Sequence, residues 1–596
     1  MKPTTDILEN VRKNSAKNND EVFTRLYRYM LRPDLYYIAY KNLYPNKGAS
    51  TKGVDNDTAD GFSKEKVDSI IQSLATGTYM PKPARRVYIK KANGKLRPLG
   101  IPTFTDKLVQ EVLRTILESV YEPVFLDCSH GFRPKRSCTT ALKSLKKSFT
   151  GIRWFVEGDI KGCFDNIDHQ VLVNIIGSKI KDVRLNQLIW KMLKVGYIDD
   201  WKYYNTFSGT PQGGIASPIF ANIYLHELDK FVMKQSADFN KAATKKYTDE
   251  YKKLLNGLDC IRQKMKRAEG EERKALIAHK KAIKKVLLKT PSKSQTDKRL
   301  CYIRYADDFL IGINGDKDDC IQIKQELSSF IRQTLKMELS EEKTLITHSN
   351  QYARFLGYDV RIRRDQTIRP KGDKGYTQRT FSNMTELNVP LDDKIMSFLF
   401  NRCIIKQDDE KIKPIHRKYL LHCTELEIVS AYNAELRGIC NYYSIASNFS
   451  TLKYFAYLME YSCLLTLCAK HKSTIGKIKT LYKDGKGQWG IPYKNAKGET
   501  FRRYFAYYLD CKNTKQLNDN KPTATMLFSN SRNTFETRLK AKKCELCGST
   551  DSEHYEIHHI HKVKDLKGKQ PWERMMIAKR RKTMVVCREC HHEIHK

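Results

Sequence analysis

The segment Tyr305-Ala306-Asp307-Asp308 constrains the fold more than any other part of the sequence. It places two adjacent aspartates between two short apolar runs, residues 301–303 and 309–311. This pattern predicts two strands of a hairpin with the carboxylates at its tip. Because adjacent carboxylates repel each other, a cation should join them there, and Mg²⁺ is the usual one. A pair of aspartates is also common in an ordinary solvated turn, so other motifs must decide between the two interpretations.

The composition points to a polyanionic partner. The formal net charge of the 596 residues is +41, which is costly in self-repulsion unless nucleic acid or, alternatively, an anionic membrane surface neutralises it. No apolar run is long enough to cross a bilayer, and residues 1–22 carry no apolar signal core. Most of the sixteen cysteines are single, which suits a reducing compartment. We therefore expect a cytoplasmic, nucleic-acid-binding protein without a membrane partner.

Charge and periodicity divide the rest of the chain into blocks. Residues 85–91 and 95–99 alternate on either side of Asn93-Gly94, which predicts a second hairpin. Residues 230–295 are rich in Lys, Arg and Glu at helical spacing. They predict a helical insertion, which is either a solvated pair of charged helices or a basic surface that contacts RNA. Residues 385–480 have apolar residues at helical spacing and are expected to be all-helical.

A third carboxylate joins the aspartate pair. Residues 153–160 have the pattern of a buried strand in which Asp159 stands near the end. Together with Asp307 and Asp308, this residue could bridge two Mg²⁺ ions about 4 Å apart. One ion would activate the 3′-hydroxyl of a primer and the other would stabilise the leaving pyrophosphate, which is the chemistry of nucleotidyl transfer.

The order of the motifs resembles that of reverse transcriptases. The motifs are Gly158-Asp159-Ile160 with Phe164, then 211–214, 305–308, 339–344 and 355–358. The resemblance implies that Asp159, Asp307 and Asp308 are the catalytic, metal-binding triad. It also implies that Lys90 and Arg97 grip the incoming triphosphate through charge-assisted contacts. Phe164 would stack under the sugar and exclude a 2′-hydroxyl, and Gln212 would line the nucleotide pocket.

Further segments are similar to group II intron-encoded proteins, most closely to the lactococcal type. They are residues 97–103, 130–134, 210–218 and, in a part that resembles the maturase (X) domain, 435–443. The resemblance implies a bacterial cytoplasmic protein that binds its intron RNA, promotes splicing and is associated with the nucleoid when bound to target DNA. It also implies cleavage of the second strand of a double-stranded DNA target and copying of the inserted intron RNA by target-primed reverse transcription from dNTPs, that is, intron mobility or retrohoming.

The maturase role would need a broad cationic surface rather than a reaction centre. Candidates for RNA binding are Arg417, Lys418, Lys470 and Lys472. Tyr442 and Tyr443 could stack on unpaired bases, although their helical spacing favours a place in the core.

Two Cys-x-x-Cys pairs stand near the C-terminus, Cys544 with Cys547 and Cys587 with Cys590. Together they predict a closed tetrahedral site for structural Zn²⁺. A redox disulfide is the alternative, but two pairs in a basic block are not typical of thioredoxin-like proteins.

The histidines around these cysteines resemble an HNH endonuclease of the ββα-metal fold. The resemblance implies that His559 is the general base that activates water. His558 with His591 or His595 would hold one Mg²⁺ at the scissile phosphate, and Glu556 could orient a histidine. Thr583 stands where many members have an asparagine. The alternative is a zinc-stabilised DNA-binding knuckle that does not cleave.

We therefore expect a multidomain α+β protein. It would combine a right-hand polymerase with fingers and an antiparallel palm sheet, an all-α thumb or maturase domain, and a small zinc-stabilised HNH domain; a homodimer is one option. Alternatives are a splicing-only maturase with vestigial catalytic sites and another reverse transcriptase lineage, such as a retron or CRISPR-associated enzyme. The expected divisions are an RNA-binding N-terminal extension (1–60), fingers and palm (61–370), maturase or thumb (371–485), a DNA-binding region (486–540) and the HNH endonuclease (541–596).

Overall fold

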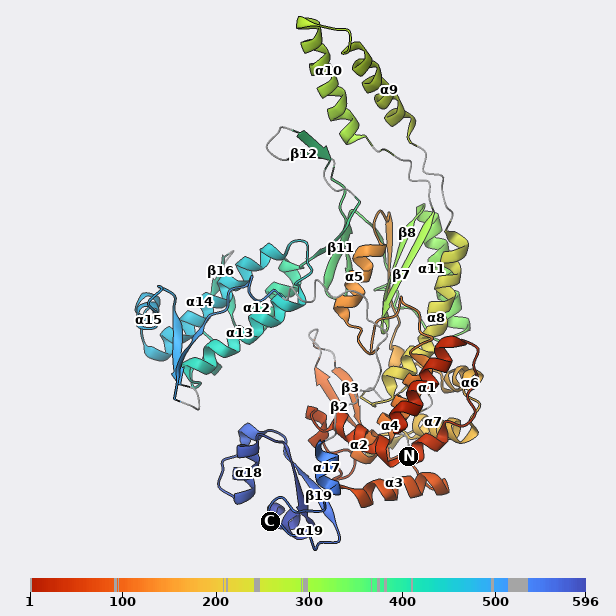
Figure 1. Cartoon of the computed structure of the whole chain (residues 1–596), viewed down its shortest axis with the longest axis vertical. Coiled ribbons are helices and arrows are strands. Elements are labelled where there is room, and N and C mark those ends of the chain that lie inside the picture. The colour runs from red at the N-terminus through yellow and green to blue at the C-terminus, as the bar shows by residue number, and fades with distance from the viewer. Residues whose placement is uncertain are drawn as a thin grey trace.

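The structure of the chain is a computed structural model, shown in Figure 1. Among the described residues, no helix is both long and apolar enough to cross a membrane. The structure describes residues 3–596 except for 91–93, 95, 207, 211–212, 241–246, 291, 293–297, 366, 372–375, 380–382, 409–410, 495–497 and 513–533.

A four-stranded antiparallel sheet carries the aspartate motifs. In spatial order its strands are β7 (Arg299–Tyr305), β8 (Asp308–Asn314), β4 (Trp154–Asp159) and β9 (Ile346–His348). The hairpin predicted from the two apolar runs is therefore confirmed. Because successive side chains of a strand point to opposite faces, Phe309 and Ile311 of β8 join one hydrophobic core and Leu310 joins another. The sheet separates these two cores.

Helices cover both faces of this sheet (Figure 1). α8 (Ser217–Phe239) and α11 (Lys317–Gln333) contribute to the first core, and α5 (Cys138–Ser148) contributes to the second. The first core continues into the N-terminal helices, which gather around the almost fully buried α4 (Phe104–Tyr121). These and the neighbouring short elements are α1 (Thr4–Lys17), η1 (Tyr27–Leu31), α2 (Pro33–Leu43), η2 (Lys47–Ser50), α3 (Lys64–Thr76), η3 (Cys163–Asp165), α6 (His169–Lys179) and α7 (Val183–Lys194).

A second sheet holds the other predicted hairpin. Its order is β3 (Leu96–Ile101), β2 (Ala84–Lys90), β5 (Tyr197–Asp199) and β6 (Lys202–Tyr204). β2 and β3 are antiparallel partners, as the alternation around Asn93-Gly94 predicted, whereas β5 pairs with β2 in parallel. Successive side chains of this hairpin therefore point to opposite faces of its own sheet.

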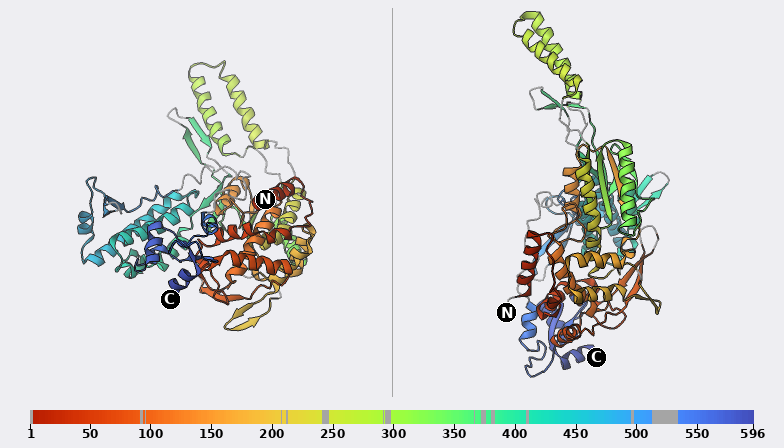
Figure 2. Two further views of the ribbon diagram at one scale, coloured as in Figure 1. Left: turned by 60° about the horizontal axis from the view of Figure 1, so that its bottom comes forward. Right: turned by 90° about the vertical axis from the view of Figure 1, so that its right-hand side faces the viewer.

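The charged insertion forms a helical hairpin that projects from the palm, as the two views of Figure 2 show. It consists of α9 (Asp249–Lys264) and α10 (Gly270–Lys289), and α10 has no buried residue. Most of its side chains contact solvent, because two isolated helices offer each other only one face to bury.

The region expected to form an all-α thumb is only partly helical, so that expectation is wrong in detail. The hairpin of β15 (Ile405–Asp408) and β16 (Lys411–Pro414) interrupts it. In β16 exposed lysines alternate with half-buried residues, which is the period of a strand. The remaining elements from the palm to the end of this region are β10 (Ala353–Phe355), β11 (Tyr358–Ile362), β12 (Ile368–Lys371), β13 (Tyr376–Arg379), β14 (Thr385–Asn388), η4 (Leu391–Ile395), α12 (Met396–Asn401), η5 (Lys418–Leu420), α13 (Glu425–Tyr442), η6 (Phe449–Thr451), α14 (Leu452–His471), α15 (Ile475–Leu481), β17 (Gly490–Lys494) and β18 (Thr500–Tyr504).

The C-terminal block packs against the N-terminal part of the chain. A short strand from the N-terminal part, β1 (Phe62–Ser63), adds to the hairpin of this block, so that the sheet order is β1-β19-β20. Apolar residues of the block belong to the same core as the N-terminal helices. Its elements are α17 (Thr534–Lys540), β19 (Tyr555–His559), η7 (Val563–Asp565), α18 (Pro571–Lys579), β20 (Thr583–Cys587) and α19 (Arg588–His595).

Candidate active sites

The three aspartates predicted to bind the polymerase metals lie at one end of the central sheet. Asp308 is the first residue of β8, and its register partner is Asp159, the last residue of β4. Asp307 belongs to the two-residue turn between β7 and β8, in which Ala306 has a φ of 58°. The fold therefore places these residues on adjoining strands and on the turn between them.

Two glycines allow other parts of the chain to approach this end closely. A Cβ on Gly131 would lie 2.3 Å from the backbone nitrogen of Ala306, and a Cβ on Gly158 would lie 2.1 Å from the ring of Phe309. A side chain at either position would displace the turn or the strand that carries an aspartate. These contacts give a physical reason for a glycine in the segments 130–134 and 157–160.

A buried ion pair supports the turn from behind, and sequence reasoning missed it. Arg304 and Asp229 are both fully buried, and their closest charged atoms lie 2.6 Å apart. The Arg304 guanidinium also donates to the carbonyl oxygen of Ala306 at 2.9 Å and to Ser129 Oγ at 2.8 Å. An arginine after the apolar run 300–303 of the predicted strand was the signal that could have revealed it, because a buried charge needs a partner.

Burial and repulsion raise the pKa values of the carboxyl groups at the tip. Burial first, and then the charges of Asp159 and Asp307, raise the pKa of Asp308 to about 7. Burial and Asp159 also raise the pKa of Asp307, although the charges of Arg97 and Lys343 act against this rise. The charged forms of these acids are therefore disfavoured without a counter-charge, and a bound cation would stabilise them.

The three carboxylates do not form a tight group of ligand atoms. Within the described part of the chain, two groups of at least three ligand atoms lie wholly within 4.8 Å: four cysteines, and three histidines with one aspartate. Lys343 Nζ lies 2.6 Å from Asp159 Oδ2 and holds that carboxylate in an ion pair. This ion pair and the mutual repulsion of the acids account for the wider spacing.

The residues predicted to contact the nucleotide come from the second sheet and from η3. Lys90 ends β2 and Arg97 lies near the start of β3, and both side chains are exposed. The charge of Arg97 reaches Asp307, whose pKa it acts to lower. Phe164 is half-buried in η3. Gln212 lies outside the described residues.

The four cations predicted to bind RNA do not share one environment. Arg417 is fully buried and its guanidinium lies 2.8 Å from a carboxylate oxygen of Glu435. Its assignment to an RNA-binding surface is therefore wrong, because this arginine contacts Arg402 and Glu435 inside the fold. Lys418 and Lys472 are exposed, and Lys470 is half-buried.

The two tyrosines considered for base stacking connect the end of α13 to the turn between β10 and β11. The Tyr442 hydroxyl donates to the carbonyl oxygen of Leu356 at 2.5 Å, and the Tyr443 hydroxyl donates to that of Gly357 at 3.1 Å. Tyr443 is only 5% exposed. The preference for a core role is confirmed for Tyr443, and both hydroxyl groups are used to hold two parts of the chain together.

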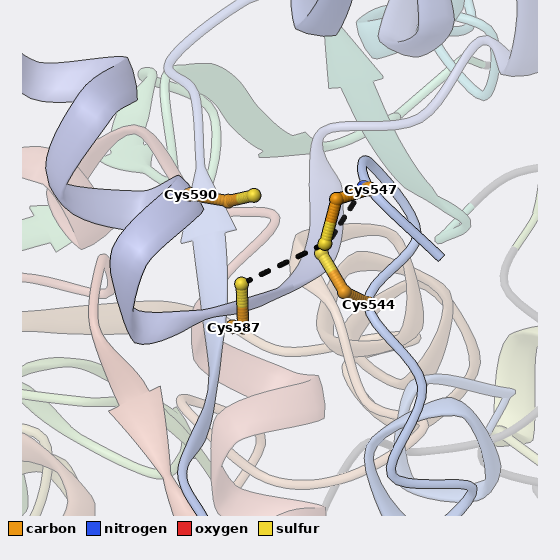
Figure 3. A group of neighbouring side chains, drawn as sticks. All are labelled: Cys544, Cys547, Cys587 and Cys590. Carbon is orange, nitrogen blue, oxygen red and sulfur yellow. Dashed lines mark hydrogen bonds between the residues drawn. The ribbon is translucent and has the colours of Figure 1, made fainter. Parts of the chain in front are cut away.

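The four cysteines of the C-terminal block converge, as Figure 3 shows. None of them forms a disulfide. The Sγ atoms of Cys547 and Cys587 lie 3.8 Å apart. Four sulfurs around one Zn²⁺ with bonds of about 2.3 Å would be separated by about 3.8 Å at the corners of a tetrahedron. The donor set and its spacing therefore fit a closed structural metal site, and the block contains a four-cysteine cluster able to hold a metal ion.

The second group of ligand atoms contains the three histidines that were predicted to hold the nuclease metal. It consists of His558, His591, His595 and, from the N-terminal part of the chain, Asp60. Asp60 Oδ1 lies 3.3 Å from His558 Nδ1 and 3.2 Å from His591 Nε2. Asp60 Oδ2 lies 2.7 Å from His595 Nε2. Sequence reasoning missed Asp60, and no local pattern around it indicates a ligand.

Secondary structure explains why the histidines meet. His558 lies on β19, and His591 and His595 are four residues apart on α19, where they share one face. His591 Nδ1 and Glu556 Oε2 lie 2.5 Å apart, which turns the other ring nitrogen toward Asp60. Burial lowers the pKa of His591, but the contacts with Asp60 and Glu556 outweigh it and raise this pKa to about 9.

The predicted general base lies next to this group but is covered. His559 Nε2 lies 3.1 Å from the carbonyl oxygen of Tyr44, and the residue is 8% exposed. Burial lowers the pKa of His559, which keeps the ring neutral as a base requires. Its register partner on β20 is Thr583, the residue at the expected asparagine position.

Profiles of three protein families match the chain. Reverse transcriptase (RNA-dependent DNA polymerase) matches residues 89–269 and 275–360, type II intron maturase matches 382–520, and AI2M/AI1M-like HNH endonuclease matches 544–591. The group II intron-encoded protein LtrA of Lactococcus lactis subsp. cremoris is 59% identical over 600 residues, which covers 100% of both chains. The chain belongs to the group II intron-encoded proteins.

More distant similarities extend this result. An uncharacterized 91 kDa protein in the cob intron of Schizosaccharomyces pombe is 34% identical and covers 99% of this chain and 72% of its own. The protein YkfC of Escherichia coli is 32% identical over 56% of this chain and 82% of its own. An apo telomerase from Candida tropicalis has a TM-score of 0.29 at 13% identity, covering 50% of this chain and 55% of its own, and no inference rests on it.

The predicted resemblance is therefore confirmed. As a group II intron-encoded protein, the chain is a multifunctional protein of RNA splicing and intron mobility, with reverse transcriptase and HNH endonuclease activities beside its maturase part. Its mixed helical and sheet content and its C-terminal HNH domain agree with the expected fold class.

Proposed function

We propose that target-primed reverse transcription takes place at the end of the central sheet, with Asp159, Asp307 and Asp308 as the ligands of two Mg²⁺ ions. The register pairing of Asp159 with Asp308 is the observation that carries this proposal. Mg²⁺ held there would supply Lewis-acid activation of the primer hydroxyl and charge stabilisation at the leaving pyrophosphate. The raised pKa values of Asp307 and Asp308 support it. Burial and the charge of Asp159 make the ionised carboxylates unfavourable, and a bound cation would compensate for both effects.

The surrounding cations prepare this site for a triphosphate. Lys343 neutralises the Asp159 carboxylate until it is needed as a ligand. Arg97 and Lys90, on the exposed hairpin, bind the phosphates of the incoming dNTP. Phe164 would stack beneath the sugar and exclude a 2′-hydroxyl. Gln212, which lies outside the described residues, is kept as a predicted contact of the nucleotide.

We further propose that the C-terminal domain cleaves the second strand of the DNA target. His559 accepts a proton from the attacking water, and Glu556 orients His591. His558, His591 and His595 hold one Mg²⁺, which would supply polarisation of the scissile phosphate. The convergence of the three histidines within 4.8 Å supports this assignment.

The four-cysteine cluster is proposed to hold structural Zn²⁺. It ties the loop of Cys544 and Cys547 to the end of β20 and to the first turn of α19. Because α19 also carries His591 and His595, the zinc would fix the helix on which the nuclease depends.

The RNA partner is proposed to be the chain's own intron, and the DNA partner its insertion target. Exposed Lys418 and Lys472, half-buried Lys470 and the N-terminal extension (1–60) would neutralise compact RNA. Residues 486–540 would contact DNA. RNA affinity should therefore fall steeply with salt concentration, and a flat salt profile would contradict this surface.

The proposal is tested by separating the three roles in the full-length protein. Asp307→Ala with Asp308→Ala should abolish cDNA synthesis and leave intron splicing intact. His559→Ala should leave cDNA synthesis intact and abolish second-strand nicking. If splicing failed equally in the folded aspartate variant, the division of roles would be wrong, and unchanged nicking would exclude His559 as the base.

A further inference from the structure

The contact between the nuclease domain and the N-terminal part of the chain is built around one aspartate. β1 pairs with β19 through Phe62 and Ile557, and the Gly61 N–H donates to the carbonyl oxygen of Ile557 at 3.1 Å. Asp60 lies two residues before this strand, and its Oδ1 accepts the backbone N–H of His559 at 2.7 Å. The strand pairing therefore fixes the Asp60 carboxylate against the nuclease site.

The spacing of the four side chains is compatible with metal coordination. With bonds of about 2.0–2.1 Å, adjacent ligands of one ion lie about 2.9 Å apart in an octahedron and about 3.3 Å apart in a tetrahedron. The separations from Asp60 Oδ1 to His558 and His591 are 3.3 and 3.2 Å, and the Nε2 atoms of His591 and His595 are 3.3 Å apart. The four ligand atoms all lie within 4.8 Å of one another, so one ion could contact all of them.

His558 supplies an independent observation. It is 3% exposed, and neither of its ring nitrogens makes a hydrogen bond of standard geometry within the described part of the chain. Buried polar atoms are normally satisfied, so an imidazole buried in this way needs a partner that protein atoms do not provide. A metal ion between His558 and Asp60 would be that partner.

We propose that Asp60 is a fourth protein ligand of the nuclease metal ion, so that the metal site is shared between the N-terminal segment and the HNH domain. This inference rests on the proposed histidine site and adds to it a ligand from the other end of the chain. It follows that metal binding is linked to the docking of the HNH domain on the N-terminal segment. An ion that bridges Asp60 and the histidines stabilises the docked arrangement, and docking increases the affinity for the ion by the same free energy.

The docked arrangement also covers the general base. The carbonyl oxygen of Tyr44 occupies the Nε2 side of His559, so that the attacking water and the scissile phosphate do not reach this nitrogen until the two parts separate. The four-ligand site therefore belongs to the resting form of the nuclease, in which the metal is retained and the base is protected.

The test measures Mn²⁺ binding to the full-length protein by electron paramagnetic resonance. All samples carry Asp307→Ala and Asp308→Ala, so that the polymerase site does not contribute. Asp60→Asn keeps an oxygen that can accept the His559 N–H but removes the negative charge, and it should weaken Mn²⁺ binding by at least about tenfold. Asp68→Asn, at an exposed position on the adjacent α3, is the matched control and should bind as the parent does.

His591→Ala separates failure of this inference from failure of the proposed nuclease site. If His591→Ala loses Mn²⁺ while Asp60→Asn binds within about twofold of the parent, Asp60 is not a ligand and the inference is overturned. If neither variant changes binding, the histidine site itself is wrong, and the inference falls with it. The zinc content should stay constant in all variants, which shows that the domain remains folded.

Amide hydrogen exchange gives a second readout that does not depend on activity. Mn²⁺ should slow exchange in residues 61–63 and 555–559 of the parent, because the ion stabilises the pairing of β1 with β19. The same addition should have no effect on exchange in Asp60→Asn. Equal protection by Mn²⁺ in both proteins would overturn the proposed linkage.

Discussion

Asp159 and Asp308 face each other as register partners on the antiparallel strands β4 and β8. Directly opposed residues of such strands have Cβ atoms about 4.5–5.5 Å apart. Burial first, and then the charge of Asp159, raise the pKa of Asp308. The register pairing brings the two residues close enough to act as one unit in binding cations.

Loss of these two aspartates should not be additive. Asp159→Asn and Asp308→Asn should each lower the rate of single-nucleotide extension by about 10³-fold, and the double variant should lose at most about tenfold more, because both residues hold the same cations. Single-turnover extension on a primed RNA template measures this. Asp318→Asn, exposed on α11, is the control. Effects that multiply to about 10⁶-fold would show that the residues act independently.

Glu556 should matter for cleavage although it is not proposed to touch DNA. Glu556→Gln weakens the contact that orients His591, and second-strand nicking should fall by about 10–100-fold while cDNA synthesis is unchanged. End-labelled duplex DNA provides the assay. Glu553→Gln, which changes an exposed acid just before β19, should nick at the parental rate. If Glu556→Gln nicked the second strand at the parental rate, Glu556 would not be needed to orient His591.

The cysteine cluster should determine the zinc content of the protein. Cys587→Ser removes one of four thiolate ligands, so the chain should lose most of its zinc in the presence of a mild chelator. Elemental analysis of the purified protein measures this directly. Cys260→Ser, at an exposed position on α9, keeps the full content. A Cys587→Ser protein that retained all its zinc would place the ion elsewhere.

Buried His226 should make the fold sensitive to acid. Burial lowers its pKa to about 4, and its Nδ1 has no hydrogen-bond partner among the described residues. The unfolded chain binds a proton at this histidine at higher pH than the folded chain does. Stability is therefore full above about pH 6.5 and falls as the pH drops toward 4, with a loss of about 2 kcal/mol at pH 5.

The variant His226→Gln isolates this contribution. The difference in unfolding free energy between about pH 7.5 and pH 5, from denaturant titration, should be smaller than in the parent by about 2 kcal/mol. His279→Gln, which changes an exposed histidine on α10, should retain the full parental difference. An unchanged acid sensitivity in His226→Gln would mean that His226 does not titrate between those values.

Features encoded within a few neighbouring residues were predictable. The hairpin around Asp307 and Asp308 follows from apolar runs on each side of the acids, and the structure has it in the predicted place. The two Cys-x-x-Cys pairs converge, as expected for a sequence spacing that lets two cysteines bind one tetrahedral metal ion. Arg417 was wrongly placed on the surface because its burial depends on Glu435, a partner that no local pattern identifies.

The amino-acid sequence by itself determined which chemistry this protein can perform, because ligand types, their spacing and the alternation of apolar residues are local properties of the chain. Only the tertiary structure decided which distant groups share a site. Asp60 reaches the nuclease histidines because β1 pairs with β19, and Asp159 reaches Asp308 because β4 pairs with β8. The partner of a strand depends on packing across the whole fold, so these encounters cannot be read from either segment alone.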